Sequence, residues 1–185
     1  MVNSITISFL INFLLECSCF MDIFQATEFL RKQIKNPSVG LPDDIFSFVS
    51  QVTPLINVDL LIKDEQKRVL LSWRDGIYDG AGWNVPGGIV RFKETLEARI
   101  LKVAETEVGA KLEFNPHPIA INQLFAQQNT RGHFISLLYK CFLSKNYELP
   151  NKGLSSNDVG FLKWHNKCST ALVDCNRYPH FPDLE

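Results

Sequence analysis

Apolar residues recur with the period of an α-helix in three parts of the chain. This spacing predicts amphipathic helices over residues 22–35 and 43–52, the second beginning at Pro42, a residue that suits the first turn of a helix. A third helix, of about four turns, follows residue 95, and Gly109 stands where its C-terminal cap belongs. The apolar face of this third helix comprises Leu96, Ile100, Val103, Ala104 and Val108.

Other apolar runs have the composition of β-strands. Residues 55–62 are mostly apolar, which predicts a central strand, although Asp59 interrupts the run. A Pro-Gly-Gly turn at 86–88 ends a further apolar segment, and 75–82 is a glycine-rich loop. The pattern alone supports an α/β or α+β fold. Further strands are predicted at 68–73, 119–125, 133–143 and 161–164, with a short helix at 168–175.

Composition narrows the class of protein. A chain of 185 residues with 45% hydrophobic and 21% charged residues is expected to form one domain with a sizeable core. The net charge of −1 offers no basic surface for phosphate backbones, so nucleic acid is not expected as a partner. The five cysteines lack the paired spacing of zinc ligands, which favours reduced, buried thiols.

The first twenty residues differ from the rest of the chain. They are apolar, carry Glu16 as their only charge and lack the basic start of a signal peptide. We interpret 1–20 as an extension outside the fold, with a membrane-associating segment as the alternative. Residues 21–40 then form an N-terminal helix and linker, and 41–185 the main domain. A cytoplasmic protein without membrane contact is expected. Whether it forms a homodimer is an open question at this point.

The most specific motif lies between residues 82 and 110. It resembles the Nudix box, G-x5-E-x7-R-E-U-x-E-E-x-G-U, in which U is an aliphatic residue. The resemblance implies the Nudix fold, an α/β fold in which a mixed β-sheet is sandwiched between α-helices. Glu94 and Lys102 would form a pair that replaces the family's glutamate–arginine brace between loop and helix. The matching positions are Gly88, Glu94, Lys102, Glu107 and Gly109.

Within the Nudix hydrolases, the chain resembles the GDP-mannose mannosyl hydrolase branch. Val103 and Thr106 stand where the box has two glutamates, and Glu107 keeps the third, which is the pattern of that branch. The resemblance covers residues 41–165. Outside the box it rests on three segments: 53–59, 69–74 and His133-Phe134.

The resemblance implies a site for Mg²⁺, which Mn²⁺ could replace. Hard divalent ions take oxygen ligands, and Mg²⁺ binds few protein groups. Glu107 is the first expected ligand, and the carbonyl of Gly87 is the second, because a Gly-Gly segment lets a backbone oxygen approach an ion closely. Asp158 aligns with a third ligand position of the branch. Because Ser-Asn-Asp-Val-Gly is also an ordinary turn sequence, both readings of Asp158 stay open.

Three residues are expected to contact the substrate: Arg74, Asp59 and Phe134. A guanidinium grips phosphate oxygens through paired hydrogen bonds, so Arg74 is the expected diphosphate contact. Arg74, Asp59 and Glu107 are the expected catalytic residues.

Two positions depart from the branch. Val159 stands where the branch has a histidine that looks like the general base, and valine cannot accept a proton. Ile89 replaces an arginine directed at the diphosphate. His133 is a further candidate for the base, although a lone histidine at a strand start is more often structural.

The function expected from these residues is Mg²⁺-dependent hydrolysis of a nucleoside diphosphate linked to another group. A sugar nucleotide such as GDP-mannose, releasing GDP and the sugar, fits the branch. Two alternatives stay open. One is a nucleoside di- or triphosphate pyrophosphohydrolase, and the other is a catalytically impaired module of the same fold that binds nucleotides.

The N-terminal interpretation predicts that residues 1–20 are dispensable. A chain that begins at Met21 should match the full-length protein in solubility and in melting temperature, because the motif-bearing domain lies downstream. Thermal unfolding of both proteins in the same buffer checks this. Aggregation of the shorter chain, or a loss of several degrees, would contradict the interpretation.

Overall fold

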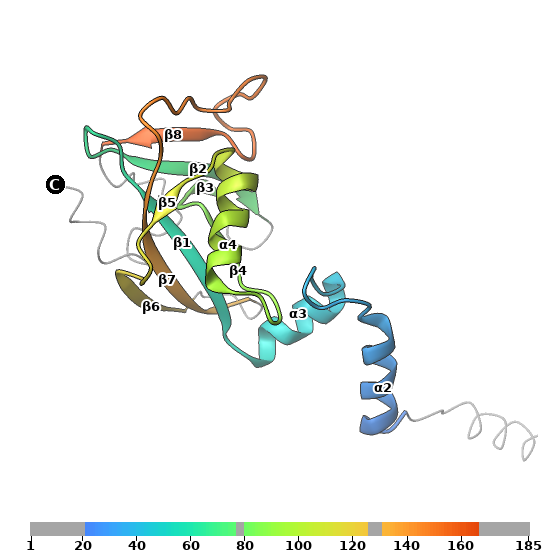
Figure 1. Ribbon diagram of the computed structural model, residues 1–185. Helices are drawn as coiled ribbons and strands as arrows, with labels where there is room; N and C mark the ends of the chain where they lie inside the picture. The colour runs from blue at the N-terminus through green and yellow to red at the C-terminus, as the bar shows by residue number, and fades with distance from the viewer. Residues whose placement is uncertain (1–20, 77–79, 126–130, 167–185) are drawn as a thin grey trace, which may run out of the picture. The chain divides into compact units, whose positions relative to one another are not determined.

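A computed structural model describes residues 21–76, 80–125 and 131–166 (Figure 1). Chain contacts divide the protein into two units, residues 1–36 and 37–185. The first unit holds helix α2, Ile23–Gln33, which lies within the predicted 22–35. Asp22 caps α2 because its side chain accepts from the backbone of Gln25, and the Gln25 side chain accepts from Asp22 in return.

The larger of two sheets is mixed and holds β1 at its centre. Strand β1, Leu55–Ile62, pairs in parallel with β7, His133–Phe142, along its whole length. The predicted central strand 55–62 is therefore confirmed. The other strands pair antiparallel in the order β4-β1-β7, with β5 and β6 both on β7: β4 Gly87–Ile89, β5 Glu113–Phe114 and β6 Ala120–Phe125.

The second sheet is antiparallel and has three strands in the order β3-β2-β8. These are β3 Gly80–Asn84, β2 Val69–Gly76 and β8 Leu162–His165. The predicted loop 75–82 is wrong at both ends, because Asp75 pairs with Ala81 and Gly76 with Gly80. Small residues on facing strands let this hairpin continue where glycine suggested a loop. The predicted helix at 168–175 lies outside the described residues.

Two helical segments belong to the second unit. Helix α3, Asp43–Val52, begins after Pro42 as predicted. The predicted helix of four turns is α4, Leu96–Val103, continued by a π-helical turn η1, Ala104–Val108. Gly109 ends η1 with φ 71°, the left-handed cap predicted for it. Within the described ranges, no helix is both long and apolar enough to form a membrane-spanning segment.

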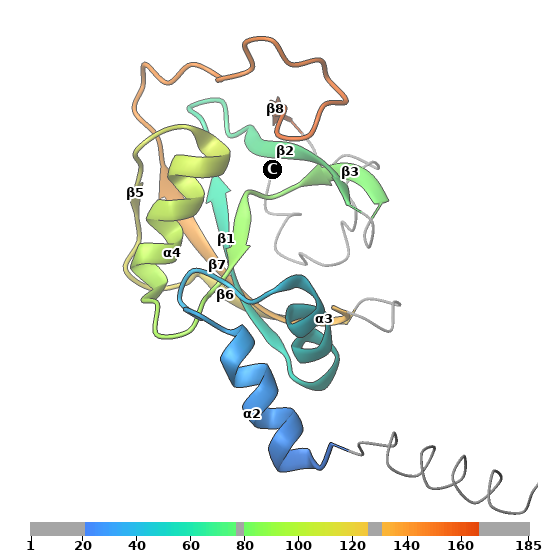
Figure 2. The same ribbon diagram turned by 90° about the vertical axis from the view of Figure 1, so that its right-hand side faces the viewer.

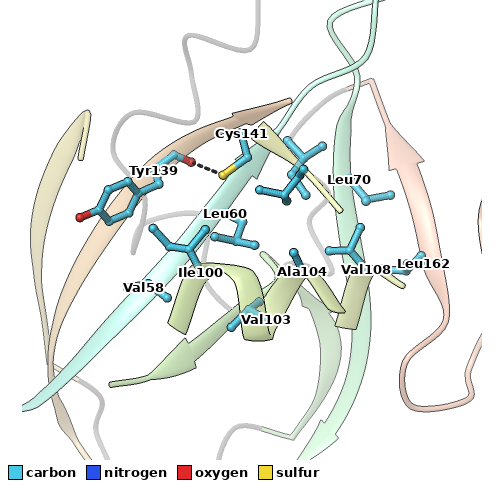
Figure 3. Packing of buried hydrophobic residues seen from close by; sticks show 12 residues of the cluster. Val58, Leu60, Leu70, Ile100, Val103, Ala104, Val108, Tyr139, Cys141 and Leu162 are labelled. Atoms are coloured by element: carbon cyan, nitrogen blue, oxygen red, sulfur yellow. Dashed lines mark hydrogen bonds between the residues drawn. The ribbon is translucent and has the colours of Figure 1, made fainter. Parts of the chain in front are cut away.

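The core lies on both faces of the larger sheet. On one face, the apolar side of α4 and η1 packs against Val58 and Leu60 of β1, as Figure 3 shows. On the other face, Leu61 and Leu138 pack against Leu71 and Trp83 of the smaller sheet. Figure 2 shows α4 on one side of β1 and strands β2 and β3 on the other. The architecture is α/β, with a mixed sheet between helices on one face and a second sheet on the other.

The predicted Pro-Gly-Gly turn is instead a crossing between the two sheets. The chain leaves the smaller sheet at Asn84 and enters the larger sheet at Gly87, where it pairs with β1. Pro86 already takes part, because its carbonyl accepts from the backbone of Leu60. The composition of residues 86–88 predicts a turn, but in the structure these residues lead into the extended edge strand β4.

Gly87 and Gly88 have no room for a side chain. A Cβ on Gly87 would lie 2.2 Å from Oδ1 of Asp59, and one on Gly88 would lie 2.9 Å from Cγ2 of Val103. Successive residues of a strand face opposite sides, so the first glycine meets the β1 face that carries Asp59 and the second meets α4. Both glycines are needed for close approach and not for unusual backbone angles.

This packing predicts a cost for Gly88→Ala. The new methyl group should destabilise the fold by about 1–3 kcal/mol, because it overlaps Val103 in a closely packed region. Urea unfolding measures the change. Gly76→Ala is the matched control, since nothing lies within 4 Å of the Cβ position there, and it should stay within about 0.5 kcal/mol.

The double variant Gly88→Ala/Val103→Ala separates overlap from other effects. Removing the Val103 methyl groups makes room for the new one, so the double variant should cost less than the sum of the two single variants. Strict additivity of the two changes would show that this contact does not limit the position.

Candidate active site

Arg74, Gly87 and Glu107 meet at one point. The Nη2 of Arg74 donates to the carbonyl of Gly87 at 3.1 Å and to both carboxylate oxygens of Glu107 at 2.9 and 2.7 Å. The backbone N–H of Gly87 also donates to Glu107, at 3.3 Å. The three residues come from β2, β4 and η1, and both charged side chains are partly exposed, at 39% for Arg74 and 28% for Glu107.

The elements explain why these side chains converge. Leu70, Ser72 and Arg74 lie on one face of β2, and Leu70 is buried in the cluster that contains α4. Arg74 therefore points to the side of the helix. Glu107 lies in the π-turn η1, whose end is held by the Tyr147 hydroxyl donating to the carbonyl of Val108 at 2.7 Å.

Asp59 is buried against the other side of Gly87. Asp59 is only 2% exposed, and one of its carboxylate oxygens accepts from Asn57 Nδ2 at 2.5 Å. The other oxygen accepts from the hydroxyl of Ser136 on β7. These two donors compensate the burial of the carboxylate and fix its direction. The strand carboxylate predicted for the site is thus adjacent to Gly87.

Phe134 lies on the same face of the larger sheet as Asp59. It is the β7 partner of Leu55, two residues from Ser136, and is half-buried. His133 alternates to the opposite face, where its ring stacks on Phe125 with 4.6 Å between centroids and its Nε2 lies 3.1 Å from Gln123 Nε2. A base at His133 would therefore act from the face opposite to Asp59.

Asp158 lies in an exposed turn before β8. Its carboxylate accepts from the backbone of Ser155 at 2.7 Å, and its carbonyl accepts from Phe161. Among the described residues, Asp158 forms no hydrogen bond or ion pair with Gly87 or Glu107. The hydrogen bonds of Asp158 are those of a turn residue. Its role as a metal ligand stays a prediction. Val159 beside it is 64% exposed.

The predicted pair of Glu94 with Lys102 is wrong. Glu94 binds Arg99, whose Nε and Nη2 both lie 2.8 Å from its Oε2, and it also accepts from the backbone of Arg91. Lys102 instead binds Glu105 at 2.8 Å on the exposed side of the helix. Arg99 lies five positions after Glu94, and this places the guanidinium in the first part of α4, where the loop returns. Lys102 is almost one turn further along.

The environment of Glu94 favours its charged form. Burial by itself raises the pKa of this carboxyl group, but the hydrogen bonds from Arg91 and Arg99 and their positive charges outweigh burial. The pKa of Glu94 therefore lies below its ordinary value. Elsewhere, burial raises the pKa of the free Cys141 thiol to about 12, so it stays protonated, as expected for a buried cysteine.

The converging oxygens suit a small cation. The Gly87 carbonyl and the Glu107 carboxylate both accept from one nitrogen of Arg74, so they already surround a single positive group. Oxygen donors of this kind are those that Mg²⁺ prefers. Among the described residues, no group of three or more His, Cys, Asp or Glu side chains could hold a metal ion.

Several residues of the site were not anticipated. Arg99 braces Glu94, Asn57 and Ser136 orient Asp59, and Asn122 lies buried beside Ser136. A signal for Asn57 and Ser136 exists in the sequence, because each is a polar residue within an otherwise apolar strand run. Their partnership with Asp59 depends on the pairing of β1 with β7, which periodicity does not specify.

Solved structures with the same fold identify the class of architecture. A MutT Nudix hydrolase from Burkholderia pseudomallei is 17% identical, with a TM-score of 0.55 over 72% of this chain and 99% of that one. A MutT protein from Methanosarcina mazei is 18% identical, with a TM-score of 0.52 over 71% and 91%. No protein-family model matches the chain. The fold is that of the Nudix hydrolases.

A comparison of sequences shows the family of the chain, beyond its fold. Agl8 of Haloferax volcanii, named a low-salt glycan biosynthesis protein, is 38% identical over 117 residues, which are 61% of this chain and 74% of Agl8. Identity at this level over most of the relative is evidence of common descent. The chain therefore belongs to the same family as Agl8.

The revised brace predicts different effects for two cations of α4. Arg99→Met should cost about 1.5–3 kcal/mol, because it leaves the carboxylate of Glu94 without its main partner. Lys102→Met should show no measurable change, because the Lys102–Glu105 pair is exposed. Urea unfolding at neutral pH compares the two, and equal costs would contradict the assignment.

The pH dependence of the same variant follows from the lowered pKa of Glu94. Stability from the charged form is present above the pKa of the unfolded chain, near 4.5, and is lost as the pH falls through the lower folded value. The difference between wild type and Arg99→Met should therefore be complete at neutral pH and shrink in acid. A difference that grows in acid would exclude this cause.

Proposed function

We propose that the protein is a Mg²⁺-dependent hydrolase of a nucleoside diphosphate linked to another group, with a sugar nucleotide such as GDP-mannose as substrate. The observation that carries the proposal is the convergence of Arg74, the Gly87 carbonyl and the Glu107 carboxylate. The family relationship to a glycan biosynthesis protein supports a sugar-linked substrate, since glycan assembly uses activated sugars.

The donor set supports a divalent ion held by Gly87 and Glu107. Such an ion neutralises diphosphate oxygens and stabilises the leaving group when it is bound. Of the three glutamate positions on the box helix the chain keeps Glu107 alone, so a single ion is expected, and Mn²⁺ could replace Mg²⁺. The Gly87 N–H keeps one oxygen of Glu107 in place, which leaves the other oxygen for the ion.

Arg74 has two roles in this proposal, and it cannot fill both at the same time. Its Nη2 now lies where a cation between Gly87 and Glu107 would lie, so the guanidinium competes with the ion for the same oxygens. When it leaves Glu107, its planar fork can turn to the diphosphate, for which its partial exposure leaves access. Arg74 thus protects the carboxylate without ligand and holds the leaving group when substrate binds.

Asp59 holds a fixed direction next to Gly87. Because Asn57 and Ser136 both donate to it, Asp59 acts as an acceptor toward substrate hydroxyls or toward water. A general base supplies on the order of 10²–10⁴-fold in rate, and Val159 cannot serve as one. We therefore expect slow turnover, carried mainly by charge neutralisation and by positioning.

The point of water attack decides between two hydrolases. Attack at the sugar carbon releases GDP and free sugar, whereas attack at phosphorus releases GMP and sugar phosphate. We expect GDP and sugar, because one carboxylate remains where phosphorus-attacking relatives hold further ions. Turnover of GDP-mannose in ¹⁸O-labelled water, with products analysed by mass spectrometry, gives the answer. Label in GMP or in sugar phosphate would overturn carbon attack.

A matched pair of glutamates controls this experiment. Glu107→Gln should reduce Mg²⁺-dependent turnover by at least about 100-fold, since even indirect losses at metal sites cost 10- to 100-fold. Glu105→Gln should have little effect, because Glu105 is exposed and pairs with Lys102. Nucleotide binding without turnover in the wild type would instead favour the binding-module alternative.

A further inference from the structure

A row of three polar residues crosses the face of the larger sheet that carries Asp59. Asn57 on β1 is the register partner of Ser136 on β7, and Ser136 is the partner of Asn122 on β6. Paired residues point to the same side of a sheet, so the three side chains share one face. We call Asn57, Ser136 and Asn122 the polar row.

Two members of the polar row are already engaged. The Asn57 amide and the Ser136 hydroxyl both donate to the Asp59 carboxylate. Asn122 differs, because it is only 6% exposed and its Nδ2 has no hydrogen-bond partner among the described residues. A buried donor without a partner costs free energy, and such groups are rare in folded proteins. Asn122 is therefore an unused donor on the face of the sheet that carries Asp59.

The position of Asn122 tells which part of a ligand it meets. Gly87 lies on β4 and Asn122 on β6, with β1 and β7 between them. Three interstrand steps of about 4.8 Å, together with an offset of two residues along the strands, place the two residues roughly 16 Å apart. A group bonded directly to the diphosphate lies close to Gly87, whereas the base of a nucleotide lies beyond the ribose. The span therefore matches the nucleobase end.

We propose that Asn122 reads the nucleobase of the substrate by donating from Nδ2 to a carbonyl oxygen or ring nitrogen. This inference rests on the proposed function, because it takes the diphosphate to lie at Arg74 and Glu107. An amide suits the task, since it offers donors and an acceptor in one plane and can match the edge of a base. The neighbouring row of Leu55, Phe134 and Leu124 supplies an apolar surface beside that edge.

The proposal predicts opposite effects of Asn122→Leu on stability and on binding. Leucine keeps the branched outline of asparagine and removes the unpartnered donor, so the melting temperature should stay equal or rise by a few degrees. Affinity for the nucleoside diphosphate that binds the wild type best, chosen from GDP, ADP, CDP and UDP, should fall by at least about tenfold. Calorimetry with Mg²⁺ present measures the binding constants of the wild type and of Asn122→Leu.

Asn151→Leu is the control, because Asn151 is an asparagine with a structural role. Its side chain donates to the carbonyl of Leu162 at 2.7 Å and accepts from the N–H of Leu162 at 2.9 Å. This variant should lose melting temperature and keep nucleotide affinity. The two asparagines thus give reversed patterns if only Asn122 meets the ligand.

The outcomes separate this inference from the proposed function. Wild-type binding with unchanged affinity in Asn122→Leu would overturn the role of Asn122 alone. A loss seen with GDP-mannose and absent with GDP would overturn the base assignment, because Asn122 would then read the sugar. A lower melting temperature with unchanged affinity would make Asn122 structural. If none of the four nucleotides binds the wild type, the proposed function itself fails.

Discussion

The site depends on the lack of space on both sides of the first residues of β4. Gly87 abuts the Asp59 carboxylate and Gly88 abuts Val103 of α4, so this backbone passes between a strand and a helix that would otherwise be held apart by side chains. Close approach has a chemical consequence. It brings the Gly87 carbonyl and N–H within reach of Arg74 and Glu107 without any flexible side chain between them. Backbone groups placed in this way need little reorganisation when a charged ligand arrives.

Sequence reasoning succeeds where a local pattern and a local structure coincide. The periodic runs predict α2, α3, β1 and β7 closely, because their apolar residues repeat over several turns or several pleats. Gly109 was predicted as a cap because glycine adopts a left-handed backbone readily, and the chain does so there. Arg74 and Glu107 could be named from the box and from the strand before it, and the fold brings them together.

The failures concern information that no single segment contains. Lys102 stands at the motif position for the brace, but Arg99, three residues earlier, reaches Glu94 because the loop returns to the start of α4. Asn122 does not stand out in its strand, because the next residue, Gln123, is also polar. Its meaning depends on the register of β6 against β7, and on Ser136 being engaged by Asp59. The π-turn at the end of α4 was likewise unforeseen, because periodicity does not distinguish it from an α-helical turn.

The parallel pairing of β1 with β7 also bears on how the protein acquires its site. The contact between Asp59 and Ser136 joins residues 77 positions apart. Closing so large a loop costs chain entropy before any contact compensates it, and such non-local pairing slows folding. During synthesis the Asp59 carboxylate cannot find this partner until β7 has left the ribosome. Before that moment, β1 is a hydrophobic strand with an unpaired edge, and the nascent chain is most exposed to aggregation then.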